Sequence, residues 1–247
     1  MRSLLVILLA ILVLVLVPLG FVIVNSWTPD VDEALLDRLE NQRSCENCDL
    51  RQAGLWWMDL QGVNLTGANL SGASLWWTDL RRANLSHADL SRTSLWWAEL
   101  QDVNLQGASL ADAVLGRATL QRANLAGANL GNTDMSGSNL SEANLQGADL
   151  NRAHMLHAIL YGANLRGADL TDANLFGVDL RGADLSGVNL TRASLSEADF
   201  TDADLSGADL TETLIDTAIF CRTRTPWGIE NRGCPAAPAA GAQSSER

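Results

Sequence analysis

The sequence predicts a solenoid, a chain that coils in one direction and buries its core only where coils stack. Every fifth residue from Leu50 to Phe220 is large and apolar, thirty-five positions in one register. Thirty of these are Leu, and in twenty-four of the thirty-five units Ala lies two residues before the large apolar residue. A five-residue step would spread the Leu side chains around an α-helix and alternate them between the faces of a strand. The period therefore indicates a chain that turns once per pentapeptide.

Units such as Ala123-Asn124-Leu125 resemble those of the pentapeptide-repeat family over residues 45–220. The resemblance implies an all-β fold, a right-handed quadrilateral β-helix with four pentapeptides, hence twenty residues, in each coil. Thirty-five units then make about nine coils. We expect a transmembrane helix and a short capping helix before this β-helix, a cap segment after it and no enzymatic activity.

Residues 1–26 are predicted to form a cytoplasmic stub and a transmembrane helix that acts as a signal anchor. Leu4 to Val24 carries no charge over twenty-one residues, which is long enough to span a bilayer core. A cleaved signal peptide is the alternative, although its apolar region is usually about 7 to 15 residues long. Arg2 precedes the segment and acidic residues follow it, so we expect a single-pass protein of a bacterial cell membrane, with the repeats on the periplasmic side.

Residues 27–44 are predicted to form a linker and the capping helix. Thr28 is a candidate N-cap, with Pro29 in the first turn. Val31, Leu35 and Leu39 then fall on one helical face. This face would cover the open edge of the first coil, which could otherwise pair with another chain.

Three tryptophan pairs lie in the repeats, and they recur every twenty residues. The six side chains are Trp56, Trp57, Trp76, Trp77, Trp96 and Trp97. With twenty residues per coil they lie above one another, in outward positions after the inward Leu. Three interpretations remain open: a structural stack, a surface that binds a protein partner, and an anchor at the membrane interface. Leu156 and Phe176 continue the same wall as a second apolar patch.

The four cysteines lie at the two ends of the repeats and are possible disulfides. Cys45 and Cys48 take inward positions, so packing or a disulfide is expected there, and zinc is disfavoured because no second CxxC or His pair accompanies them. Cys221 and Cys234 could close a thirteen-residue loop in the 221–234 cap segment, with free buried thiols as the alternative. Residues 235–247, rich in Ala, Pro, Gly and Ser, are predicted to be disordered.

No catalytic, cofactor-binding or metal-binding residues are predicted. The three histidines, His87, His154 and His157, all fall in outward positions, and no glycine-rich phosphate loop is present. A stiff rod with solvent on all its walls also offers no cleft in which a reaction could be desolvated. The expected function is therefore binding.

The distribution of charge along the repeats supports an alternative function. The chain has no Lys, and residues 141–220 hold thirteen acidic residues and four Arg, a net charge of −9, against −3 for residues 45–140. Family relatives that protect DNA gyrase are thought to imitate duplex DNA with an acidic rod. This resemblance implies an alternative, an acidic DNA mimic that binds a nucleic-acid enzyme such as a topoisomerase, which the predicted membrane segment disfavours.

We therefore expect a non-enzymatic, membrane-tethered scaffold for protein–protein or membrane-surface interaction. The tryptophan wall is its expected contact surface, a protein partner is expected, and nucleic acid itself is not. Homo-oligomers through the end coils remain open.

Overall fold

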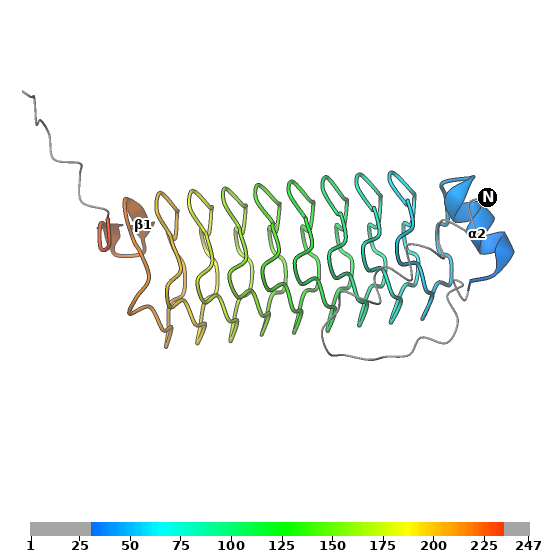
Figure 1. Cartoon of the computed structure of the whole chain (residues 1–247). Coiled ribbons are helices and arrows are strands. Elements are labelled where there is room, and N and C mark those ends of the chain that lie inside the picture. Colours follow the sequence, from blue (N-terminus) through cyan, green and yellow to red (C-terminus); the bar gives the residue numbers. More distant parts are fainter. Residues whose placement is uncertain (1–30, 235–247) are drawn as a thin grey trace, which may run out of the picture.

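The computed structural model describes residues 31–234, which form one straight rod of stacked coils (Figure 1). The predicted membrane segment Leu4 to Val24 and the predicted disordered tail lie outside the described residues. No helix within 31–234 is long and apolar enough to cross a bilayer.

Parallel bridges join each coil to the next. They connect residues twenty apart, from Ser44↔Asn64 to Asp204↔Arg224, nine steps of one coil each. The amide of Leu50, for example, donates to the carbonyl oxygen of Asn69 at 2.7 Å. The predictions of twenty residues per coil and about nine coils are confirmed.

Each pentapeptide contains one β-turn, so four turns complete a coil. In the turn formed by residues 50–53, for example, the amide of Ala53 donates to the Leu50 carbonyl oxygen at 3.1 Å. The third residue of the turns from Gln52 to Glu212 has a left-handed backbone, which Gly62 (φ 67°) adopts without a steric penalty. Both central turn residues face outward. Because turns twenty residues apart lie above one another, they form four columns along the rod.

The core consists of the Leu series and the small residues two positions before it. Leu85, Leu125 and Leu165 are fully buried, as are most of the alanines between them. Buried hydroxyls in the small position are satisfied by backbone carbonyls: Thr78 donates to Leu55 at 2.8 Å and Ser138 to Met135 at 2.6 Å. The inward register predicted from the sequence is confirmed.

Helix α2 (Glu33–Glu40) covers the first coil (Figure 1). Leu39 is fully buried, and Val31 and Leu35 pack against the core, as predicted. The predicted start at Thr28 and Pro29 lies outside the described residues; the described helix begins at Glu33, and Asp32 is its N-cap. The Asp32 carboxylate accepts from the amide of Ala34 at 3.2 Å, which satisfies a helix-terminal donor.

A hairpin covers the last coil. Strands β1 (Thr223–Thr225) and β2 (Gly228–Glu230) pair antiparallel. Phe220 stacks on Phe200 with ring centroids 5.2 Å apart, and the Arg232 guanidinium lies over Phe220 at 5.0 Å. Disulfides join Cys221 to Cys234 and, at the other end of the rod, Cys45 to Cys48. Both ends of the β-helix are thus covered by non-repeating chain.

Candidate interaction surface

One of the four columns of turns carries all six repeat tryptophans, and we call it the tryptophan column. It runs through the turns 56–57, 76–77, 96–97, 116–117, 136–137, 156–157 and 176–177. The opposite column, which lies two turns away along each coil, runs through the turns 46–47, 66–67, 86–87 and their equivalents. The tryptophan column is the surface on which the sequence departs most from the plain repeat.

Three indoles in this column form a continuous stack. Trp57 and Trp77 have ring centroids 5.2 Å apart with planes 4° apart, and Trp77 and Trp97 are 5.1 Å and 2° apart. The guanidinium of Arg117 lies 5.1 Å from the centroid of Trp97 and continues the stack by one coil. Aromatic pairs in such geometry contribute about 0.5–1.5 kcal/mol each, so the stack is a real structural element.

The backbone under these indoles is unfavourable for a bulky residue. Trp57, Trp77 and Trp97 all have positive φ, 57° to 63°, at the position that glycine fills in many other turns. A left-handed backbone costs a non-glycine residue about 1–2 kcal/mol. Stacking offsets much of this cost but gives little net stability. Stability alone is therefore a poor reason for three tryptophans at these positions.

The neighbouring positions in the same turns are packed differently. Trp76 and Trp96 are 48 % and 45 % exposed, and Trp56 is half-buried. Trp96 leans over Gly116, where an added Cβ would lie 3.1 Å from the indole Nε1 and Cε2 atoms. Gly116 therefore makes room for Trp96 and is itself buried.

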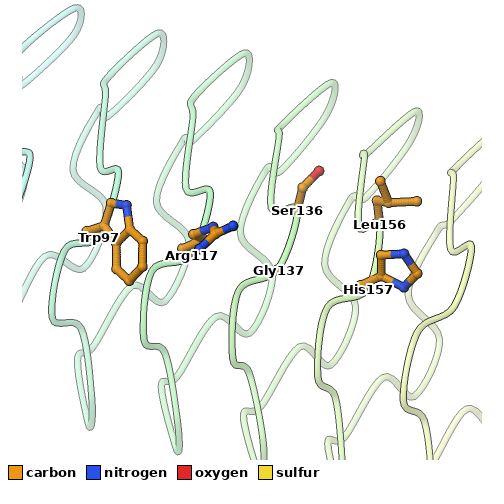
Figure 2. Close-up of a pocket in the computed structure, with 6 residues that line it drawn as sticks. All are labelled: Trp97, Arg117, Ser136, Gly137, Leu156 and His157. Carbon is orange, nitrogen blue, oxygen red and sulfur yellow. The ribbon is translucent and has the colours of Figure 1, made fainter. Parts of the chain in front are cut away.

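Beyond Arg117 the column is hollowed. A cavity of about 440 Å³ is lined by Trp97, Arg117, Ser136, Gly137, Leu156 and His157. Figure 2 shows Trp97, Arg117, Gly137 and His157 in successive coils along one row. Because Gly137 has no side chain, it leaves the floor of this hollow open.

The predicted second patch closes the far side of the hollow. Leu156 is 39 % exposed, and the Phe176 ring meets the His157 imidazole edge-on at a centroid distance of 5.6 Å. Ile159 and Tyr161 are exposed beside this patch. The structure thus joins the six tryptophans, Leu156 and Phe176 into one column, with the hollow between the two groups.

The exposed aromatic area is smaller than six isolated indoles would give. The five most exposed tryptophans of the column retain 38–57 % of their accessible surface. Since a Trp presents about 150–250 Å², these five leave roughly 400–600 Å² in contact with solvent. That equals the largest patch on a typical monomer, about 300–600 Å², but not the roughly 800 Å² of a standard interface. A partner would therefore need the hollow and the Leu156 patch as well.

Two further ladders were not predicted from the sequence. In one, half-buried asparagines one coil apart are linked amide to amide: each Nδ2 donates to the Oδ1 of the preceding coil at 3.0–3.1 Å, through Asn84, Asn104, Asn124, Asn144 and Asn164. The recurrence of Asn every twenty residues was a readable signal. This ladder stabilises the rod, because each of these side chains is bonded to its neighbour one coil away.

In the other ladder, Arg and acidic residues alternate at the third position of the turn. Arg122 donates two bonds of 2.8 Å to Asp102, and Arg192 and Asp172 pair in the same way on another column. The hydrogen bond from the Arg122 side chain is the main cause of the lowered pKa of Asp102. Much of the acidic charge of the rod is therefore paired within the rod.

The described residues contain no group of three or more His, Cys, Asp or Glu arranged to hold a metal ion. His87, His154 and His157 are all exposed, as predicted, and the Cys45 and Cys48 sulfurs bond to each other.

Comparison with known proteins agrees with the repeat and the coil. The family model described as pentapeptide repeats matches in eight copies, over residues 59–96, 98–137, 138–175 and 173–212. A search of the curated proteins finds no match.

Among solved structures, the chain is similar to HetL, a pentapeptide repeat protein involved in heterocyst differentiation regulation from the cyanobacterium Nostoc sp. strain PCC 7120. The two are 31 % identical with a TM-score of 0.60, over 80 % of this chain and 98 % of HetL. QnrB1, a plasmid-mediated fluoroquinolone resistance protein, is 20 % identical with a TM-score of 0.39, over 71 % of this chain and 90 % of QnrB1. With a family model over more than half of its length and a twenty-residue coil, the chain belongs to the pentapeptide-repeat family.

Proposed function

We propose that this protein is a non-enzymatic scaffold, tethered to a membrane by residues 1–26, that binds a protein partner through the tryptophan column. The observation that supports the proposal most is the stack of Trp57, Trp77 and Trp97, exposed to solvent on a backbone that disfavours large residues. Interfaces are enriched in Trp and Arg, and here Arg117 extends the stack.

Charge favours a protein over the membrane surface as the contact. The chain has no Lys and a net charge of −12, whereas cationic residues are what draw a protein to anionic lipids. Tryptophans that lie flat on a bilayer would bring this acidic rod close to the lipid headgroups. A membrane-surface contact is therefore the second arm of the test.

A variant without the six indoles tests the proposal. Asn replaces Trp57, Trp77 and Trp97, because Asn132 holds the same left-handed backbone (φ 56°), and Ser replaces the other three, as at Ser136. In a chain that begins at residue 27, the proposal predicts loss of protein partners with little change in liposome binding. Loss of liposome binding alone would favour the membrane surface, and no change in either would leave the indoles a structural stack.

The acidic DNA mimic remains the second candidate, because residues 141–220 carry a net charge of −9. Several of these acids are already paired: Asp172 with Arg192, Asp179 with Arg181 and Asp184 with Arg166. A topology reporter fused after Arg247 separates the two candidates. Reporter activity in the cytoplasm would favour the mimic, and activity outside it would favour the tethered scaffold.

A further inference from the structure

The stack in the tryptophan column is interrupted at one position. Trp57, Trp77, Trp97 and Arg117 supply a planar group in four successive coils, and His157 supplies another two coils later. Gly137, in the coil between Arg117 and His157, supplies none. Figure 2 shows the part of this row from Trp97 to His157, with Gly137 between Arg117 and His157.

The width of the interruption matches one ring. Coils are spaced by about 4.8 Å, so the backbones of Arg117 and His157, two coils apart, are separated by about 10 Å. The stacked indoles are 5.1–5.2 Å from centroid to centroid. One planar group placed midway would therefore lie about 5 Å from each neighbour, the spacing that the rest of the stack already has.

The walls of the hollow suit an aromatic ring with a polar edge. The Arg117 guanidinium carbon lies over the Trp97 ring, and among residues 31–234 this guanidinium makes no ion pair. Arg117 and His157 both lean toward the next coil, which keeps the gap of two coils between them: an added Cβ at Gly137 would lie 3.6 Å from the Arg117 Cγ, and one at Gly177 would lie 2.4 Å from the His157 Nδ1. Leu156 adds an apolar side, and the Ser136 hydroxyl donates to Asp134, so its oxygen can still accept a hydrogen bond.

We propose that this hollow binds one aromatic side chain of the protein partner, stacked between Arg117 and His157. A tyrosine fits best, because its ring completes the stack and its hydroxyl can donate to Ser136. A base of a nucleic acid would bring its phosphates toward a chain with a net charge of −12, which opposes binding. The inference rests on the proposed function, since it specifies one contact of the partner on the tryptophan column.

The test titrates the full chain in detergent micelles with a small probe, N-acetyl-4-fluorophenylalaninamide, followed by ¹⁹F NMR. Unlabelled N-acetyl-tyrosinamide, its cyclohexyl analogue N-acetyl-cyclohexylalaninamide, and adenosine serve as competitors. Gly137→Trp fills the hollow from within: its φ of 66° is close to the 63° of Trp57, and an added Cβ makes only a 3.6 Å contact with Arg117. Gly127→Trp is the matched control on the opposite column, with φ 63° and nothing within 4 Å.

We expect saturable broadening of the ¹⁹F line that N-acetyl-tyrosinamide reverses and the cyclohexyl analogue does not. Gly137→Trp should abolish it, Gly127→Trp should preserve it, and Arg117→Gln should weaken binding about two- to fivefold. Absence of binding to the unaltered chain, equal binding to Gly137→Trp, or adenosine competing better than the tyrosine analogue would overturn the inference.

Partner capture separates this inference from the proposed function. If capture survives loss of Trp57 and Trp77, the proposed function fails, whatever the probe does. If capture requires those tryptophans but Gly137→Trp changes neither capture nor probe binding, the proposed function stands and this inference fails.

Discussion

The stack of indoles makes a graded prediction about stability, because its middle member has two stacked neighbours and its first member has one. Among the described residues Trp77 stacks on Trp57 and on Trp97, whereas Trp57 stacks on Trp77 alone. Trp77→Asn should therefore cost more than Trp57→Asn. The backbone contribution cancels in the comparison, because φ is 57° at one position and 63° at the other.

The size of the difference follows from the geometry. One extra stacked pair contributes about 0.5–1.5 kcal/mol. Trp57 is 57 % exposed and Trp77 is 47 % exposed, a difference of roughly 15–25 Å² for a tryptophan. At about 25 cal/mol per Å² this adds about 0.4–0.6 kcal/mol. We expect Trp77→Asn to lower the free energy of unfolding by about 1–2 kcal/mol more than Trp57→Asn.

Urea unfolding of a chain that begins at residue 27, followed by far-UV circular dichroism, measures this difference. Arg92→Asn is the control, at an exposed turn position of the same backbone (φ 57°) on another column, and should change the free energy of unfolding by less than about 0.5 kcal/mol. Near-UV circular dichroism should lose its coupled indole signal in Trp77→Asn. Equal costs at Trp57 and Trp77, or a larger cost at Trp57, would refute the stacking account.

Three other predictions concern the ends and the ladders. The Cys221–Cys234 disulfide closes a loop with a sequence separation of 13, so its reduction should lower the free energy of unfolding by about 3 kcal/mol. The measurement uses a Cys45→Ser, Cys48→Ser background, in which this is the disulfide that reductant can open. A melting temperature that reductant does not change would contradict the prediction. Asn124→Ala removes two inter-coil hydrogen bonds and should lower the free energy of unfolding by about 1–3 kcal/mol. Asn129→Ala should cost less, because the Asn129 side chain makes a hydrogen bond within its own turn, from the Gly131 amide, and none between coils among the described residues. Equal unfolding midpoints for the two variants would count against the ladder. The pKa of Asp102 is lowered from 3.8 by its bond to Arg122, so this contribution to stability is complete above that value and is lost as the pH falls through the folded pKa. Carboxyl NMR titration should show the Asp102 pKa rising in Arg122→Gln and rising less in Arg82→Gln, and the reverse order would exclude the assigned cause.

The fold was predictable because a single period specifies it. The five-residue step from Leu50 to Phe220 decides which side chains are buried, and the twenty-residue recurrence of the tryptophan pairs sets the coil. The cap face of Val31, Leu35 and Leu39 was predictable for the same reason, as an apolar pattern with a helical period. Its first residue was not, because Asp32 competes with Thr28 as an N-cap and only the local backbone decides between them.

The site was predictable in outline only. Register places Trp57, Trp77 and Trp97 above one another, but whether their rings stack depends on side-chain rotamers that the spacing does not specify. The hollow depends on the absence of a side chain at Gly137 and on the direction in which His157 leans. Such features arise from neighbours twenty residues away, so comparison of residues one coil apart is the way to find them from a sequence.

Site-specific photocrosslinking of the full chain in the cells that produce it tests most directly whether the tryptophan column is the binding surface. A photoreactive residue replaces Ser136, in the tryptophan column, or Ala126, at the equivalent turn position of the opposite column. We predict a discrete protein adduct from position 136 that disappears when Trp77 is changed to Asn, and no such adduct from position 126. The same adducts from both positions, or an adduct from 136 that does not depend on Trp77, would contradict the claim that the tryptophan column is the binding surface.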